Sequence, residues 1–108
     1  MSTAVETRAP VFGALGDPNR LRIVVQLCDS GPCSTSQVTR VISVTRQAAT
    51  KHLLLLEAVG LVTSSRQGRE RIWRIEAVPL AEASAYLTAL SQRWDHALER
   101  LRAYVEES

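Results

Sequence analysis

The feature that most constrains this chain is a pair of helical patterns joined by a turn of two residues, Ser43-Val44. The run STSQ at positions 34–37 matches a capping box, in which a serine hydroxyl and a glutamine side chain satisfy each other's backbone donors. We therefore expect one helix over residues 34–42. A second helix is expected over residues 45–59, between a threonine that can cap it and a glycine that ends it. So short a connection makes the first helix brace the second, as in a helix-turn-helix.

The second of these helices has a small, apolar face and a hydrogen-bonding face. Ala48, Ala49 and Leu53 suit packing against the bracing helix. In a helix-turn-helix the start of the second helix enters the DNA major groove, where arginine can pair with guanine and glutamine with adenine. The candidate DNA contacts on this helix are Thr45, Arg46, Gln47, Thr50, Lys51 and His52. The start of the bracing helix adds Ser34, Thr35 and Ser36.

The pattern changes from helical to alternating after Gly60. Residues 61–66 and 71–75 are predicted to form two strands, joined by a turn that contains Gly68. Three basic side chains surround this turn: Arg66, Arg69 and Arg71. A basic hairpin directly after a helix-turn-helix is typical of a wing, which reaches an adjacent phosphate or the minor groove. The alternative is an ordinary solvated turn.

Two helical patterns precede this motif. Residues 1–8 are polar, and we expect them to be flexible. A short helix is expected from residue 10 to Gly16. Asp17 can then cap a helix that has proline in its first position and runs to about residue 28. A chain of 108 residues makes one domain, and we expect residues 9–106 to be its folded part.

Residues 79–106 form the longest expected helix, and its apolar residues recur at heptad spacing. One row contains Leu80, Leu87, Trp94 and Leu101, and the other contains Ala83, Leu90, Ala97 and Tyr104. Two such rows over four heptads exceed what a lone surface helix needs, so we expect this helix to pack along a second copy of itself. The alternative is that it packs only within its own domain.

Charge is distributed unevenly along the chain. The net charge is only +2, but residues 40–74 hold seven basic and two acidic residues, whereas residues 75–108 hold three basic and six acidic ones. A basic middle indicates an anionic partner for one face. No apolar run approaches the roughly 18 residues of a membrane span and no secretory signal is visible, so we expect a cytoplasmic protein. No paired nucleophile and base appear in the sequence, which argues against an enzyme.

The two cysteines, Cys28 and Cys33, are too few for a disulfide framework and do not form a zinc-binding CxxC motif. Cys28 continues the apolar pattern of Leu21, Val24 and Val25, and we expect it to be buried. Cys33 precedes a helix start, where the helix dipole would stabilise a thiolate. A thiol or soft-metal sensor built from this pair is an open alternative; no other cofactor is expected.

Four runs of the sequence carry a family resemblance: ALGDPNRLRI at residues 14–23, VTRQAATKHL at 44–53, AVGLV at 58–62 and RQGR at 66–69. Together they resemble the ArsR/SmtB family of bacterial winged-helix repressors, over about residues 10–105. The resemblance implies a homodimeric repressor that binds an operator in double-stranded DNA and is often released by an inducer. It also implies a dimer interface of the first and last helices. Its candidate residues are Phe12, Leu80, Leu87, Leu90, Trp94, Leu101 and Tyr104.

The sequence departs from the family at its two known metal sites. Many members carry two cysteines at the start of the bracing helix, where this chain has Ser34 and Ser36. On the last helix, His96 and Glu99 match half of a second site, whose other half falls near residues 83–85. Half a site does not make a tetrahedral zinc site. We therefore expect no metal there, and a solvated pair at His96 and Glu99.

The sequence thus predicts a mainly α winged helix-turn-helix with a small β-hairpin and terminal helices that form a dimer interface. We expect it to regulate transcription, with residues 45–59 in the major groove and residues 66–71 on the backbone or minor groove. A winged helix used as a protein-interaction module is the main alternative. A third hypothesis keeps DNA binding and adds a response to thiol chemistry through Cys28 and Cys33.

Overall fold

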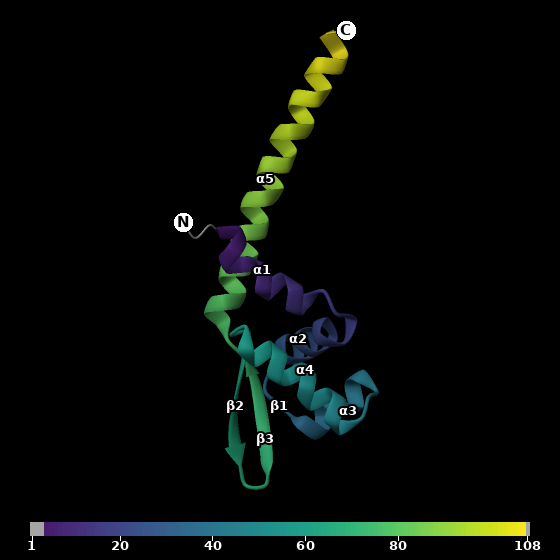
Figure 1. Cartoon of the computed structure of the whole chain (residues 1–108), viewed down its shortest axis with the longest axis vertical. Helices are drawn as coiled ribbons and strands as arrows, with labels where there is room; N and C mark the ends of the chain where they lie inside the picture. Colours follow the sequence, from purple (N-terminus) through teal and green to yellow (C-terminus); the bar gives the residue numbers. More distant parts are fainter. Residues whose placement is uncertain (1–3, 108) are drawn as a thin grey trace.

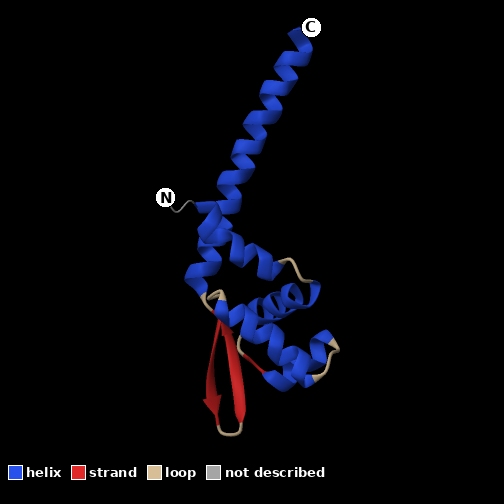
Figure 2. Cartoon of the chain, viewed as in Figure 1, coloured by secondary structure: helices blue, strands red, loops and turns tan. Residues whose placement is uncertain are grey.

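The computed structural model describes residues 4–107, which form helices and one small sheet (Figure 1). The helices are α1 (Ala4–Leu15), α2 (Pro18–Ser30), α3 (Thr35–Ile42), α4 (Arg46–Ala58) and α5 (Ala77–Glu107). The strands are β1 (Cys33–Ser34), β2 (Val62–Gln67) and β3 (Glu70–Ile75), which pair antiparallel in the order β1-β3-β2. Figure 2 shows a helical body from which a hairpin projects on one side and α5 on the other.

The core lies where α2, α3 and α4 meet the sheet. Its largest fully buried side chains include Ile23 from α2, Leu53 and Leu56 from α4, and Trp73 from β3. Burying an aliphatic side chain of this size contributes about 1.5–3 kcal/mol to stability. Because Trp73 sits on the central strand and is 1% exposed, the same core that joins the helices also anchors the hairpin.

The first helix begins earlier than the sequence predicted. α1 starts at Ala4 and contains Pro10, which the sequence analysis placed at the helix start. Residues 4–8 are therefore helical, where the sequence predicted a flexible segment over residues 1–8; residues 1–3 lie outside the described part. A proline inside a helix removes one backbone donor and is usually unfavourable, so contacts outside α1 have to offset this cost.

Two contacts join α1 to α5 and can supply that compensation. The guanidinium of Arg8 lies 2.7 Å from the carboxylate of Glu82. The rings of Phe12 and Tyr86 pack with centroids 5.9 Å apart and planes tilted by 40°, a separation within the range of interacting aromatic pairs. The two terminal helices are thus packed together within one chain.

The cap of α2 is the predicted one, but its buried face is not. Asp17 accepts hydrogen bonds from two backbone N–H groups, and the helix ends at Ser30, where Gly31 adopts a φ of +76°. The buried residues are Ile23, Val24 and Leu27. The exposed residues include Leu21, Val25 and Cys28, which the sequence analysis placed on the apolar stripe. The chain offers two overlapping stripes on this helix, and the body of the fold covers only one of them.

A two-residue strand, β1, was not predicted from the sequence. Cys33 pairs with Trp73 and Ser34 with Ile72, so β1 joins the start of α3 to the central strand. Cys33 is buried there, and its thiol donates to the carbonyl of Gly31 at 3.4 Å. The predicted burial of Cys28 is therefore wrong, because Cys28 is exposed on α2, and the buried cysteine is Cys33 in the sheet.

The hairpin is longer than predicted and its turn is tighter. The ladder runs from Val62 opposite Ile75 to Gln67 opposite Glu70. This leaves Gly68, with a φ of +64°, and Arg69 as a two-residue loop. Glycine with positive φ suits such a loop, because the backbone twist of the turn must match that of the strands. The wing therefore presents its tip on two regular strands.

Helix α5 extends well beyond the rest of the fold (Figure 1). The molecule measures 67 × 32 × 20 Å along its principal axes, and Ala83 is the only buried residue among the described residues of α5. No helix in residues 4–107 is long and apolar enough to cross a membrane.

Candidate nucleic-acid interface

The helix-turn-helix is fixed by three local caps. The hydroxyl of Ser34 accepts from the backbone N–H of Gln37 at 3.2 Å, and the Gln37 side chain accepts from the N–H of Ser34 at 2.7 Å, which confirms the predicted capping box. Ser43 ends α3 in the left-handed conformation, with a φ of +54°. Thr45 then caps α4 by accepting from the N–H of Ala48 at 3.1 Å. These caps set the direction in which α4 leaves α3.

The first turn of α4 presents an arginine that is held by α3. The guanidinium of Arg46 donates to the hydroxyl of Ser36 at 2.9 Å, and both groups remain accessible at the surface. An arginine has five N–H donors, so donors remain available after this bond. The hydroxyl of Thr50 donates to the backbone carbonyl of Arg46 at 2.8 Å and is therefore engaged within the helix.

The outward face of α4 lies opposite the core. Ala49, Leu53 and Leu56 are buried, whereas Gln47 and Lys51 are exposed. Residues separated by four positions share one face of a helix, so an amide and an ammonium group lie one turn apart on the surface. This is the part of the predicted DNA-contacting set that the fold leaves free to meet another molecule.

Two predicted contacts at the start of α3 face the interior instead. Ser34 and Thr35 are both 5% exposed. Ser34 is engaged in the capping box, and Thr35 accepts a hydrogen bond at 2.9 Å from the indole of Trp73. In this structure both side chains are therefore already engaged within the chain, which disfavours the predicted contacts of Ser34 and Thr35 with DNA. Ser36, one residue further along, stays accessible beside Arg46.

His52 was also predicted to face DNA, but it packs against the start of α2. Its Nδ1 atom lies 3.4 Å from the guanidinium of Arg20 and 4.0 Å from the carboxylate of Asp17. The backbone N–H of Arg20 donates to that carboxylate and holds the pKa of Asp17 below its ordinary value. His52 therefore connects α4 to α2, and we do not include it in the candidate interface.

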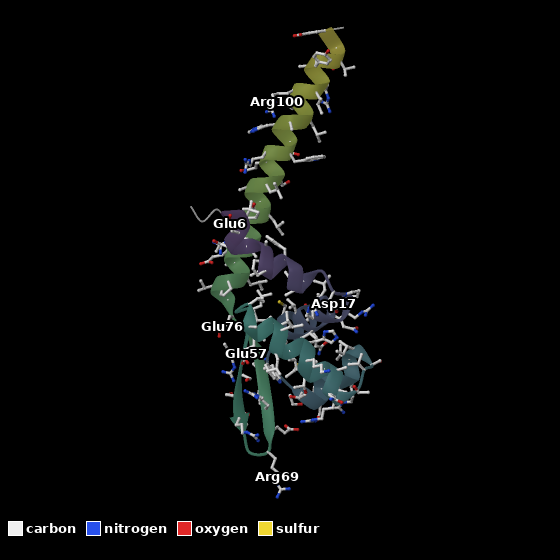
Figure 3. The ribbon with its side chains drawn as sticks, viewed as in Figure 1. Glu6, Asp17, Glu57, Arg69, Glu76 and Arg100 are labelled. Atoms are coloured by element: carbon white, nitrogen blue, oxygen red, sulfur yellow. The ribbon has the colours of Figure 1, made fainter. Side chains whose placement is uncertain are left out.

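The wing carries two exposed arginines near its tip and two hydrogen-bonded carboxylates near its base. Arg66 and Arg69 are exposed, and Figure 3 shows Arg69 projecting from the tip. The acidic residues Glu57 and Glu76 lie near the opposite end of the hairpin (Figure 3), where they accept hydrogen bonds from Ser64 and Thr63, respectively. The tip of the wing thus holds the exposed Arg66 and Arg69 together with Glu70, the first residue of β3, and its net charge is positive.

Arg71 is tied down more firmly than the other wing arginines. Its Nε donates to the hydroxyl of Ser64 at 2.8 Å, and its guanidinium carbon lies 5.2 Å from the centre of the Trp73 ring. Such a cation–π contact favours this position. Arg74, which the sequence analysis did not select, is also exposed on β3 and donates to Ser65 at 3.2 Å. The excess of basic residues in the middle of the chain was the sequence signal for it.

Comparison with known proteins identifies this arrangement. Residues 15–65 match a helix-turn-helix domain family. The HTH-type transcriptional regulator YuzN of Bacillus subtilis is 41% identical over 76 residues, which cover 65% of this chain and 83% of that protein. The solved structure of an ArsR-like transcriptional regulator from Rhodococcus sp. RHA1 is 34% identical, with a TM-score of 0.72 over 89% of this chain and 90% of that one. This chain belongs to the ArsR/SmtB family of transcriptional regulators.

Two more members extend the comparison. The transcriptional repressor SmtB of Mycobacterium tuberculosis is 37% identical over 66% of this chain, but the chain spans only 52% of the length of that repressor. A winged helix-turn-helix DNA-binding domain from Mycobacterium bovis, solved as a homodimer, is 26% identical, with a TM-score of 0.65 over 85% of each chain. The family confirms the predicted fold and the function as a DNA-binding regulator.

The residues predicted for the family's dimer interface divide into two groups. Phe12 and Leu80 are half-buried within the chain, against Tyr86 and the core, respectively. The exposed residues are Leu87, Leu90, Trp94, Leu101 and Tyr104. Several of them line an apolar groove of about 670 Å³ between α5 and the start of α1. Most of the predicted seam is therefore uncovered in a single chain.

The positions related to the family's metal sites lie apart from one another. Ser34 is buried, and His96 and Glu99 are exposed on α5. Within residues 4–107, no three histidine, cysteine, aspartate or glutamate side chains gather closely enough to hold a metal ion. Cys33 is buried in the sheet, where it pairs with Trp73 of β3, while Cys28 is exposed on α2. Opposite environments for the two thiols do not favour a shared sensor site.

Proposed function

We propose that this chain is a homodimeric repressor that places the start of α4 in the major groove of its operator and the wing tip on the adjacent backbone. The observation that carries this proposal is the position of the basic groups. Arg46 and Lys51 are exposed on α4, and Arg69 is exposed at the tip of the wing, which projects from the end of the molecule opposite the free end of α5 (Figures 1 and 3). Duplex DNA is a polyanion that a helix and a hairpin can approach together.

The proposed contacts divide by chemistry. Gln47 is exposed on the outward face of α4 and can pair with the edge of an adenine. Lys51 suits a phosphate. Arg46 is held by Ser36, so its guanidinium can meet a guanine or a phosphate without much further loss of side-chain freedom. The tip residues Arg66 and Arg69 would add contacts that carry no sequence information.

The dimer is proposed from the uncovered seam of α5. Trp94 and Leu101 are 65% and 61% exposed and lie seven positions apart, on one row of the heptad pattern. A soluble protein rarely leaves so long an apolar row in water, and a two-fold symmetric partner would cover both copies at once. The M. bovis homodimer of the same family supports this arrangement. A dimer would present two copies of α4 as recognition helices, about 34 Å apart or a multiple of that distance.

Selection of bound sequences from a random duplex pool tests the proposal. We expect two related half-sites with a fixed separation, and affinity for the selected duplex that falls steeply with salt. Gln47→Ala is expected to relax the preference at one position of each half-site. Gln92→Ala, on exposed α5, is the matched control and should keep that preference. If no sequence is enriched and binding to DNA does not depend on salt, the chain acts as an interaction module instead.

A further inference from the structure

Leu54 is a large apolar side chain on the surface of α4, and it is not part of the core. It is 44% exposed, whereas its neighbour Leu53 is fully buried. A single exposed leucine is ordinary in a soluble protein. Leu54 is a candidate for a DNA contact because it lies on α4, the helix that we propose enters the major groove.

The place of Leu54 follows from helical geometry. Relative to Gln47, the residues Thr50, Lys51 and Leu54 lie three, four and seven positions further along, so all four follow one face of α4. The recognition helix of a homeodomain reads the major groove with side chains at the same spacing. Seven residues advance about 10.5 Å along a helix, which is about three base-pair steps of B-DNA. Leu54 therefore continues the face that begins with Gln47.

The charges around Leu54 favour DNA over another protein as the molecule that covers it. Lys51 lines the same shallow groove, which has a volume of about 420 Å³ and also includes Leu55 and Ala58. Glu57 is the one acidic residue of α4, all of which the structure describes, and it accepts a hydrogen bond from Ser64 of the wing. The apolar surface at Leu54 therefore has the cation of Lys51 beside it, and the one carboxylate of α4 is hydrogen-bonded to the wing. Such a surface suits a polyanion that also carries an apolar group.

The DNA major groove carries one such group, the C5-methyl of thymine. We propose that Leu54 contacts the methyl group of a thymine in each operator half-site, about three base pairs from the base that Gln47 reads. This inference rests on the proposed function. It makes Leu54 a specificity-determining residue, since cytosine and the purines present no methyl group at that place.

Replacement of thymine by uracil tests this contact, because the two bases differ only in the methyl group. Each thymine of the selected duplex is replaced in turn, and affinity is measured for the wild-type chain, Leu54→Ala and Leu21→Ala. We expect one uracil position per half-site to weaken wild-type binding about fourfold, which corresponds to about 0.8 kcal/mol for one buried carbon group. Leu54→Ala should lose the sensitivity at that position.

Leu21→Ala is the matched control. Leu21 is 47% exposed, similar to Leu54, but it lies on α2, outside the face of α4 that begins with Gln47. It should keep the full response to uracil, and both variants should unfold at nearly the wild-type temperature. If no uracil position matters, or if Leu54→Ala responds like the wild type, the inference is overturned while the DNA-binding proposal stands. If the wild-type chain selects no sequence, both fail.

Discussion

The indole Nε1 of Trp73 donates a 2.9 Å hydrogen bond to the hydroxyl of Thr35, across 38 positions of sequence. The bond is buried and joins the central strand of the wing to the first residue of α3. The pairing of β1 with β3 lies beside it, at Cys33 and Ser34. The wing and the helix-turn-helix are therefore held in one orientation by side-chain and backbone bonds together.

Removal of the Thr35 hydroxyl should destabilise the fold. Thr35→Val keeps the shape but leaves the buried Trp73 N–H without an acceptor, which costs about 1–3 kcal/mol. Thr35→Ser keeps the hydroxyl and is expected to retain most of the stability. Urea unfolding of the three proteins measures the difference. Equal midpoints for the Val and Ser variants would show that this hydrogen bond contributes little.

Removal of charge at the wing tip should weaken DNA binding without changing its specificity. Arg69→Ala removes one phosphate contact from each wing of the dimer, so it is expected to lower affinity for all duplexes alike and to reduce the slope of log affinity against log salt by about two. Arg102→Ala removes the same charge from exposed α5 and is the control. Titrations at several salt concentrations measure both slopes. A slope for Arg69→Ala that equals the control would place Arg69 away from the phosphates.

The cap of α2 should make stability depend on pH in the acid range. Hydrogen bonds from the backbone, chiefly that of Arg20, hold the pKa of Asp17 below its ordinary value, and His52 and Arg20 face the same carboxylate. A lowered folded-state pKa means that the charged form stabilises the fold. This contribution is fully present above the unfolded-state pKa and is lost as the pH falls through the folded-state pKa, below about pH 4.

Asp17→Asn isolates this effect, because asparagine is also a good helix cap but does not titrate. The wild type is expected to be more stable than the variant at pH 7, and the difference should shrink at about pH 3. Urea unfolding at the two pH values measures it. A difference that stays constant would mean that the charge of Asp17 does not contribute.

Features set by neighbouring residues could be predicted from the sequence, and features set by distant partners could not. The capping box of Ser34 and the caps at Asp17 and Thr45 depend on contacts within three residues, and each was predicted. The two-residue strand β1 exists only because β3 lies beside it, and the burial of Thr35 depends on an indole 38 positions away. No local pattern carries that information.

The same reason explains the mistakes on α2 and α4. The apolar residues of α2 make two overlapping stripes, and only the packing of the other elements decides that Ile23 is buried and Leu21 is exposed. His52 lies at the border of the buried face of α4, and the approach of Arg20 turns it toward α2. The outward positions of Gln47 and Lys51 could be predicted, because they follow from the helical period alone.

A charge on the seam of α5 should break the dimer without unfolding the chain. Trp94 is 65% exposed in the single chain, so Trp94→Glu leaves the fold of one copy intact, but in a dimer the carboxylate would be buried without a partner at a cost of several kcal/mol. Light scattering is expected to give twice the chain mass of 11.9 kDa for the wild type and a single chain mass for the variant. Gln92→Glu adds the same charge two residues away, off both apolar rows, and should remain dimeric. A measured wild-type mass of one chain would contradict the proposed dimer. A Trp94→Glu variant that remains dimeric would show that the dimer interface lies elsewhere than on this seam.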